Sequence, residues 1–165
     1  MYEELLELLI RNNLRLAVAE SCTGGLVSAA VTDIPGISQV YVGSVTSYEN
    51  AVKEHLLKVP GEVLATVGAV SEECAKFMAM GVAGAMDCNA AISTTGIAGP
   101  TGAVPGKPVG TVCIGYYIKG KVFTETNHFC GSRSEVRAAA VERAISRFVE
   151  LIVMYGKCLE CSQSL

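Results

Sequence analysis

The chain has 165 residues, a net charge of −3 and 50% hydrophobic residues, which together predict a single domain with a sizeable core. No cluster of Lys and Arg resembles a nucleic-acid footprint, so we expect no nucleic-acid partner. The N-terminus, MYEELLELLI, lacks the basic residues of a signal peptide, and the longest apolar run, Phe77–Met86, is too short to span a bilayer, so we expect no membrane contact and a cytoplasmic location.

The first half of the chain alternates predicted helices and strands. Apolar residues repeat at helical spacing from Tyr2 to Ile10, and residues 15–19 read as a short buried strand. The small residues of 24–32 predict a helix that ends at the turn sequence Asp33-Ile34-Pro35-Gly36. The pattern then predicts a strand over 41–48, a short helix over 50–57 and a helical turn over 62–66.

The second half begins with a helix for which Ser71 is the predicted N-cap, with a buried face running from Cys74 to Ala85. It continues with a strand over 90–94, a loop rich in Gly and Pro, strands over 109–118 and 122–129 joined tightly at Lys119-Gly120, and a helix over 133–155 capped by Gly156. Crossovers of the parallel type followed by a hairpin predict an α/β fold, a three-layer α/β/α sandwich around a mixed β-sheet. We expect one domain over 1–165, with a frayed tail over 156–165.

The seven cysteines predict no metal centre. Five of them stand singly in apolar segments, where small buried side chains are the simplest interpretation. Cys158 and Cys161 form a CxxC pair at the C-terminus, and one such pair without a second pair or a nearby His is weak evidence for zinc. We therefore expect no metal and no other cofactor, and the free thiols fit a reducing compartment.

Three segments follow predicted strands, where ligands collect in open α/β sheets: 20–25, 48–53 and 94–102. Ser21 lies between a strand and the N-terminus of a helix, whose free N–H groups can hold an oxyanion or a phosphate. The residues alone leave two interpretations of Ser21 open, a helix cap or a nucleophile. The adjacent Cys22 is read as a packing residue rather than a thiol nucleophile.

A serine nucleophile needs a base, and neither His55 nor His128 lies in a pattern typical of a Ser-His-Asp triad. Lys53 is the remaining candidate, because a desolvated lysine can accept a proton from serine; a solvated helix lysine is the alternative. Arg133 and Arg137, at the start of the last helix, are candidates either for a phosphate contact or for surface salt bridges.

Seven segments, in this order, resemble one family: AESCTGG, TDIPGIS, SYENAVK, GAVSEECA, TGIAGPTG, KPVGTV and GSR. Over about 14–149 the chain is similar to the CinA C-terminal domain family, whose members include stand-alone nicotinamide mononucleotide deamidases of the PncC type. The resemblance implies an amidohydrolase that converts nicotinamide mononucleotide into nicotinate mononucleotide and ammonia, in pyridine nucleotide salvage, without a cofactor.

The resemblance also implies roles for individual residues. Ser21 matches the nucleophile, Lys53 the general base that activates it, and Tyr48 a third catalytic residue. The N–H groups of Thr23, Gly24 and Gly25 would hold the oxyanion. The residues expected to bind the mononucleotide substrate are Glu20, Asn50, Thr95, Gly96, Ile97, Ala98, Gly99 and Arg133.

Some of these assignments keep alternatives. Glu20 is either a counter-charge for the pyridinium ring or a buried carboxylate bonded to the backbone. The chain departs from the family pattern at Ser132, where Asp is usual, and in the extra Ala103-Val104-Pro105. Two other functions also stay open, a non-catalytic nucleotide-binding module and an interaction domain linked to competence or DNA damage. The apolar first and last helices offer a surface for a homo-oligomer.

Overall fold

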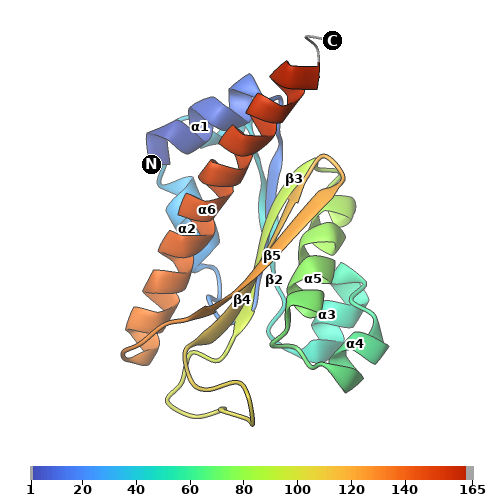
Figure 1. Ribbon diagram of the computed structural model, residues 1–165, viewed down its shortest axis with the longest axis vertical. Helices are drawn as coiled ribbons and strands as arrows, with labels where there is room; N and C mark the ends of the chain where they lie inside the picture. The colour runs from blue at the N-terminus through green and yellow to red at the C-terminus, as the bar shows by residue number, and fades with distance from the viewer. Residues whose placement is uncertain (1, 163–165) are drawn as a thin grey trace.

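In the computed structural model, a five-stranded sheet lies between two layers of helices (Figure 1). The structure describes the backbone of residues 2–162 and the side chains of 4–155. The strands are β1 (Leu16–Glu20), β2 (Tyr41–Thr46), β3 (Ala90–Gly96), β4 (Thr111–Ile118) and β5 (Lys121–His128). The helices are α1 (Tyr2–Arg11), α2 (Leu26–Thr32), the 3₁₀ turn η1 (Ile37–Gln39), α3 (Asn50–Leu57), α4 (Gly61–Thr66), α5 (Glu72–Ala85) and α6 (Arg133–Ser162).

The sheet is mixed, with the order β2-β1-β3-β4-β5. β1 runs parallel to both of its neighbours, β2 and β3. β3 pairs with β4 in the antiparallel direction, and so does β4 with β5. α1, α2 and α6 cover one face, and α3, α4 and α5 cover the other (Figure 1). The predicted three-layer α/β/α sandwich is therefore confirmed, and the carboxyl ends of β1, β2 and β3 meet at one edge.

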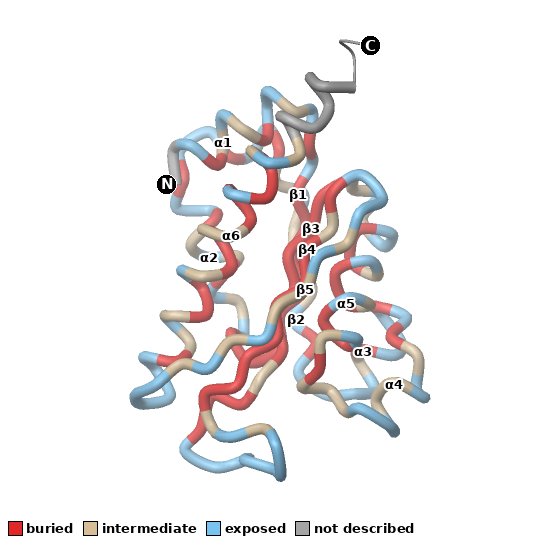
Figure 2. The backbone as a smooth tube through the Cα atoms, viewed as in Figure 1, coloured by how far each residue is buried: buried red, intermediate tan, exposed pale blue. Residues whose placement is uncertain are grey.

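β1 is the centre of the core, because all five of its residues are buried (Figure 2). Leu16 and Val18 face the apolar cluster under α1, α2 and α6. Ala17 and Ala19 face the cluster under α5, where their small side chains let that helix approach the sheet closely. The larger side chains of β1 thus face α1, α2 and α6, and its alanines face α5.

α5 also packs closely against the end of α3. A Cβ atom added at Gly81 would lie 1.9 Å from the carbonyl oxygen of Leu57, a distance that no real contact allows. Three residues further along the same helix, Gly84 has no heavy atom within 4 Å of the corresponding position. The contact at Gly81 holds the end of α3 against α5, and α3 carries Lys53.

We expect Gly81→Ala to lower the free energy of unfolding by about 1–3 kcal/mol or more, because α3 must move to admit the methyl group. Gly84→Ala is the matched control and should raise it by up to about 1 kcal/mol through helix propensity. Urea denaturation of both variants measures the difference. Equal effects of the two substitutions would contradict the close α3–α5 contact.

The start of α6 shows a capping box that the sequence analysis missed. The Ser132 hydroxyl lies 3.4 Å from the N–H of Glu135, and the Glu135 carboxylate accepts from the Ser132 N–H at 2.7 Å. This reciprocal pair satisfies free N–H groups at the helix start. The serine that departs from the family pattern therefore has a structural task, and burial plays no part in it because both residues are exposed.

Other differences from the predicted elements concern their ends. The predicted helix over 24–32 begins only at Leu26, and the strand predicted over 90–94 continues to Gly96. The predicted cap at Gly156 is wrong, because α6 continues to Ser162. The side chains of Cys158 and Cys161 lie outside the described residues, as does the end of the tail predicted over 156–165.

Candidate active site

Ser21 is fixed at the point where three parallel strands end. Its N–H donates to the Thr94 carbonyl, at the end of β3, over 2.9 Å. On the other side, the N–H of Ser47 donates to the Glu20 carbonyl over 2.7 Å, which extends the pairing of β1 with β2 by one step. Ser21 and Ser47 are thus held side by side at the carboxyl edge of the sheet, where the sequence placed a site.

Glu20 is fully buried, and its carboxylate caps α2. One oxygen accepts from the Thr23 hydroxyl and from the N–H groups of Gly25 and Val27, at 2.6, 3.0 and 3.0 Å. The other accepts from the N–H of Ser28 at 2.8 Å. With four donors from its own chain and no exposed surface, this carboxylate is closed to a ligand. The structure therefore selects the second interpretation of Glu20, a structural carboxylate, and corrects its assignment to substrate binding.

We expect Glu20→Gln to lower the free energy of unfolding by about 1.5–3 kcal/mol, because an amide cannot accept with both of its heavy atoms and its NH₂ would face N–H donors. Glu142→Gln, at an exposed position on α6, should change stability by only a few tenths of a kcal/mol. Thermal or urea unfolding gives the comparison. A Glu20→Gln protein as stable as the control would contradict the capping role.

Lys53 is the other buried ionisable group at this edge, with 1% of its surface exposed. Its Nζ atom lies 3.0 Å from Ser21 Oγ. The same nitrogen donates to the carbonyls of Ser47 and Tyr48, at 2.7 and 3.2 Å. Of the two interpretations of Lys53, the solvated helix lysine is therefore wrong. Its amine contacts Ser21 from α3, the helix that follows β2.

The three contacts of Lys53 define what each atom can do. Carbonyl oxygens only accept, so two N–H bonds of the amine are directed at Ser47 and Tyr48. In the neutral amine, the remaining position is a lone pair that faces the Ser21 hydroxyl. Desolvation by burial lowers the pKa of Lys53 below its usual range, with Cys74 and Cys22 acting in the opposite direction. The geometry and the burial both favour an amine that accepts a proton from Ser21.

The lowered pKa of Lys53 has a consequence for stability. Between that pKa and the ordinary lysine pKa of about 10.4, the unfolded chain binds a proton that the folded protein does not. The free energy of unfolding therefore rises with pH in this window, and Lys53→Met should flatten that slope. Urea unfolding at a series of pH values tests this, with Lys76→Met, at an exposed lysine, as the control. Parallel slopes for wild type and Lys53→Met would contradict it.

The residues after Ser21 form a turn in which Gly24 donates its N–H to the Ser21 carbonyl at 3.1 Å. The N–H of Gly25 is occupied by Glu20, as described above. Both glycine N–H groups are thus used inside the protein, which corrects their assignment as oxyanion donors. Among the described residues, the N–H groups of Cys22 and Thr23 have no main-chain acceptor, which leaves them as the candidate oxyanion donors of this turn.

The Cys22 thiol is not a competing nucleophile. It is buried, with 6% of its surface exposed, and burial raises its pKa to about 12, with Glu20 adding to the rise. The thiolate is the reactive form of cysteine, so at neutral pH this side chain stays a protonated packing residue. This agrees with the interpretation made from the sequence.

Tyr48 connects the Ser21–Lys53 pair to α6. Its carbonyl accepts from Lys53, and its hydroxyl accepts from Arg133 Nη2 at 3.1 Å. Arg133 Nη1 donates to the Gly99 carbonyl at 2.9 Å. The tyrosine side chain is 61% exposed, so its ring is open to a ligand. Three elements predicted to form one site, the segment after β2, the loop after β3 and the start of α6, are thus in contact.

Two residues near the end of β3 brace the loop that follows. The Thr95 hydroxyl, 1% exposed, donates to the Ala69 carbonyl at 2.7 Å. A Cβ atom at Gly96 would lie 2.6 Å from the Thr111 carbonyl oxygen, so only glycine lets β3 and β4 approach this closely. Both residues therefore act on the backbone: Thr95 through its hydroxyl and Gly96 by allowing the close approach of β4.

The next two residues are packing residues. The side chains of Ile97 and Ala98 are 9% and 4% exposed, and the Ile97 N–H donates to the Thr111 carbonyl. Their side chains are therefore not substrate ligands, whereas Gly99 presents its carbonyl to Arg133. Asn50, the first residue of α3, is exposed beside Tyr48 and stays a candidate ligand.

The extra Ala103-Val104-Pro105 lies in a small turn outside this cluster. Val104 and Lys107 exchange two backbone hydrogen bonds, of 3.1 and 2.9 Å. The Lys107 ammonium donates to the Val67 carbonyl at 2.6 Å, which ties the turn to the end of α4. The added residues are exposed in this turn, and among the described residues no main-chain hydrogen bond joins them to Gly99.

Two residues of the site were not found from the sequence in their actual role. Ser47 is fully buried and supplies a carbonyl to Lys53; its place directly after β2, equivalent to that of Ser21 after β1, was the available signal. Arg137 was considered for phosphate, but its guanidinium donates to the carbonyls of Cys22 and Thr23, at 3.1 and 2.9 Å. Contacts to backbone carbonyls leave no signature in a sequence.

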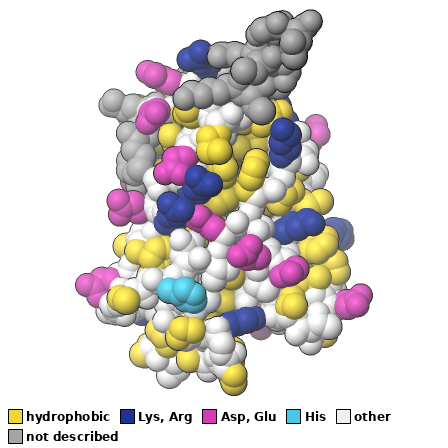
Figure 3. Space-filling model, viewed as in Figure 1, with side chains coloured by type: hydrophobic (Ala, Val, Ile, Leu, Met, Phe, Trp, Pro, Cys, Tyr) yellow, Lys and Arg dark blue, Asp and Glu magenta, His cyan; other side chains and the backbone are white. Residues whose placement is uncertain are grey.

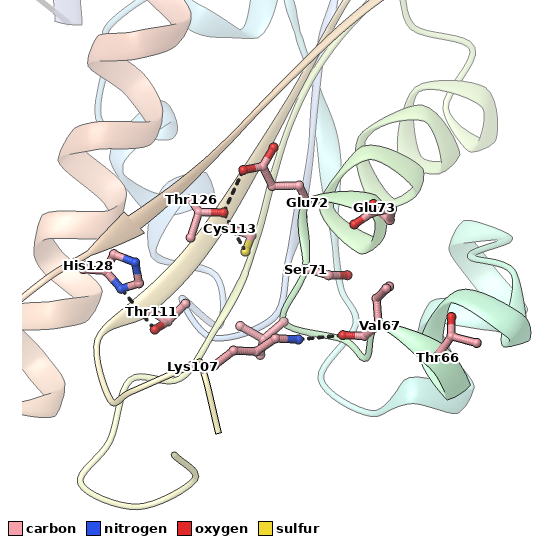
Figure 4. A pocket seen from close by; sticks show the side chains of 12 residues that line it. Thr66, Val67, Ser71, Glu72, Glu73, Lys107, Thr111, Cys113, Thr126 and His128 are labelled. Carbon is pink, nitrogen blue, oxygen red and sulfur yellow. Dashed lines mark hydrogen bonds between the residues drawn. The ribbon is translucent and has the colours of Figure 1, made fainter. Parts of the chain in front are cut away.

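A hollow of about 630 Å³ lies elsewhere, between the start of α5 and the strands β4 and β5 (Figure 4). Neither Ser21 nor Lys53 lines it. Glu72 and Glu73 border it, and the one lysine there, Lys107, is committed to the Val67 carbonyl. Two carboxylates disfavour a phosphate-bearing ligand, so we do not assign this hollow to a nucleotide.

Two further observations concern the described residues alone. There, no group of His, Cys, Asp and Glu side chains is arranged to hold a metal ion, and no helix is long and apolar enough to cross a membrane. On the face shown in Figure 3, Lys and Arg side chains are interspersed with Asp and Glu side chains.

Comparison with known proteins identifies the family. The family model described as the CinA C-terminal domain matches residues 1–152. The chain belongs to the CinA C-terminal domain family. A competence-damage inducible protein of Clostridium tetani is 50% identical over 137 residues, 83% of this chain and 34% of that protein. A CinA-like protein of Dictyoglomus thermophilum is 44% identical over 135 residues, 82% of this chain and 33% of the relative.

The CinA domain described here therefore spans about a third of the length of these curated relatives. Solved structures match it over nearly their whole length. A CinA superfamily protein of Klebsiella pneumoniae superposes with a TM-score of 0.89 at 33% identity, covering 93% of this chain and 96% of that one. The competence/damage inducible protein CihA of Agrobacterium tumefaciens gives a TM-score of 0.81 at 36% identity, covering 93% and 94%.

Proposed function

We propose that this CinA domain is an amide hydrolase in which Ser21 is the nucleophile and Lys53 the general base. The observation that carries the proposal is the buried Lys53 amine, 3.0 Å from Ser21 Oγ, with two carbonyls taking its N–H bonds. Burying a lysine without a carboxylate partner is costly, and such a group is typical of a site that needs a neutral amine.

The reaction follows from these atoms. Ser21 Oγ attacks the carboxamide carbon while its proton passes to Lys53. The tetrahedral oxyanion then collapses, the C–N bond breaks, and Lys53 returns the proton to the departing nitrogen, which leaves as ammonia. Water attacks the resulting ester with Lys53 again as base, which releases the acid and restores the Ser21 hydroxyl. No step requires a cofactor.

We propose nicotinamide mononucleotide as the substrate, as the family resemblance implied. The exposed Tyr48 ring supports this choice, because an aromatic face attracts a cationic pyridinium ring. Arg133, held beside Tyr48 and Gly99, keeps further N–H donors for the phosphate. Both groups lie next to the reacting pair, because Tyr48 also binds Lys53 through its carbonyl.

We expect Ser21→Ala and Lys53→Met each to lower ammonia release from nicotinamide mononucleotide by at least about a thousandfold. In the wild type, kcat/KM should rise with pH and level off above the lowered pKa of Lys53, because only the neutral amine accepts the serine proton. Ammonia release at a series of pH values, with thermal unfolding of each variant, measures both effects.

Arg147→Ala, which removes an exposed i,i+3 ion pair with Glu150, is the control and should keep full activity. Wild-type binding of nicotinamide mononucleotide without ammonia release would favour a non-catalytic nucleotide-binding module instead. Full activity of Ser21→Ala would exclude this mechanism.

A further inference from the structure

The guanidinium of Arg137 donates two hydrogen bonds to the backbone of the turn that follows Ser21. Nε donates to the Cys22 carbonyl at 3.1 Å and Nη2 to the Thr23 carbonyl at 2.9 Å. Arg137 is half-buried on α6, more than a hundred residues from the turn, so this contact is a tertiary brace. A Cβ atom at Gly24, which has a φ of +60°, would lie 3.3 Å from Nη2, so a side chain there would press on the guanidinium.

The two bonds fix the direction of N–H groups as well as carbonyls. In a planar trans peptide, the C=O and N–H of one unit point in opposite directions. Holding the Cys22 carbonyl toward α6 therefore turns the Thr23 N–H away from α6. Among the described residues this N–H has no acceptor, whereas the Gly24 N–H, oriented by the second bond, donates to the Ser21 carbonyl.

The Thr23 N–H also lies on the correct side of the turn. Cys22 and Thr23 both keep negative φ, so the turn that begins at Ser21 resembles the start of a helix. In such a turn, the side chain of the first residue faces the N–H groups two and three residues further on. Of these two N–H groups, only the one on Thr23 has no acceptor among the described residues, and Thr23 itself is buried beside Ser21.

We propose that Arg137 is a positioning residue that aims and polarises the Thr23 N–H as a donor to the oxyanion; the proposal rests on the proposed function. A carbonyl bound by a cation polarises its own amide, which makes the attached N–H a stronger donor. Because Arg137 holds this orientation before substrate binds, the donor is in place when charge develops on the carboxamide oxygen. Arg137 does not touch the substrate in this role.

The alternative is one of the two roles that the sequence left open, a phosphate contact, and it differs from a positioning role in its kinetics. A positioning role predicts that Arg137→Ala lowers kcat by about 10- to 100-fold, with KM for nicotinamide mononucleotide changed less than about threefold. Added guanidinium ion should restore at least part of kcat in Arg137→Ala and none in Ser21→Ala. Arg137→Lys, which keeps the charge but not the forked donors, should be intermediate.

A phosphate role predicts the opposite split. KM would rise for nicotinamide mononucleotide, kcat would stay unchanged, and nicotinamide riboside, which lacks the phosphate, would be processed equally by wild type and variant. That result would overturn the proposal. Arg147→Ala, another arginine of α6 with only a surface ion pair, is the matched control and should resemble the wild type in every measurement.

A second readout separates this proposal from the proposed function. A fluorophosphonate probe reacts with an activated serine by forming an O–P bond and releasing fluoride, and its phosphoryl oxygen occupies the oxyanion position. Labelling of Ser21 should be about 10-fold slower or more in Arg137→Ala, with recovery on addition of guanidinium. Wild type that is labelled but releases no ammonia would end the proposed function and leave this inference standing. Equal labelling rates in wild type and folded Arg137→Ala, or in Arg137→Lys if the alanine variant does not fold, would overturn the inference.

Discussion

The buried carboxylate of Glu20 is the constraint on which the rest of the site depends. Glu20 is the last residue of β1, and its carboxylate accepts from N–H groups at the start of α2. The chain between β1 and α2 must therefore form a short loop of fixed shape. Ser21 is the first residue of that loop. A negative charge without an arginine or lysine partner is held here by helix N–H groups and a hydroxyl, which is the environment that a helix N-terminus provides. The reactive hydroxyl thus takes its position from a residue that never meets the substrate.

A second layer of support comes from elements far away in the sequence. α3 brings the Lys53 amine, and α6 brings Arg133 and Arg137. Each of these three side chains donates to backbone carbonyls: Lys53 to those after β2, Arg133 to that of Gly99, and Arg137 to those after Ser21. Arg133 and Arg137 thus bring positive charge close to the serine, an arrangement suited to a reaction that builds negative charge on an oxygen.

Much of this fold follows from the sequence. The buried strands, the hairpin and the N-cap at Ser71 are each written in local patterns, and the carboxyl edge of the parallel strands predicted where a site would lie. The burial of Lys53 is different, because a lysine on a short helix has the pattern of a solvated residue, and only the packing of α3 against α5 encloses it. The residues alone left Lys53 as a candidate base for Ser21 beside the solvated alternative, and the family resemblance favoured the pairing. Neither the residue patterns nor the family resemblance predicted the contacts of Arg137, because its partners are main-chain oxygens. The predicted cap at Gly156 was wrong because a glycine within a long helix does not by itself end the helix.

The small turn closed by Val104 and Lys107 gives the domain a place where its length can vary. Paired main-chain bonds close the base of the turn and the Lys107 ammonium binds the Val67 carbonyl, so the turn is held by contacts of its own and not by Ser21 or Lys53. Insertions or deletions at 103–106 should therefore change only the turn itself. A longer turn, or a peptide inserted there, should leave the positions of Ser21 and Lys53 unchanged.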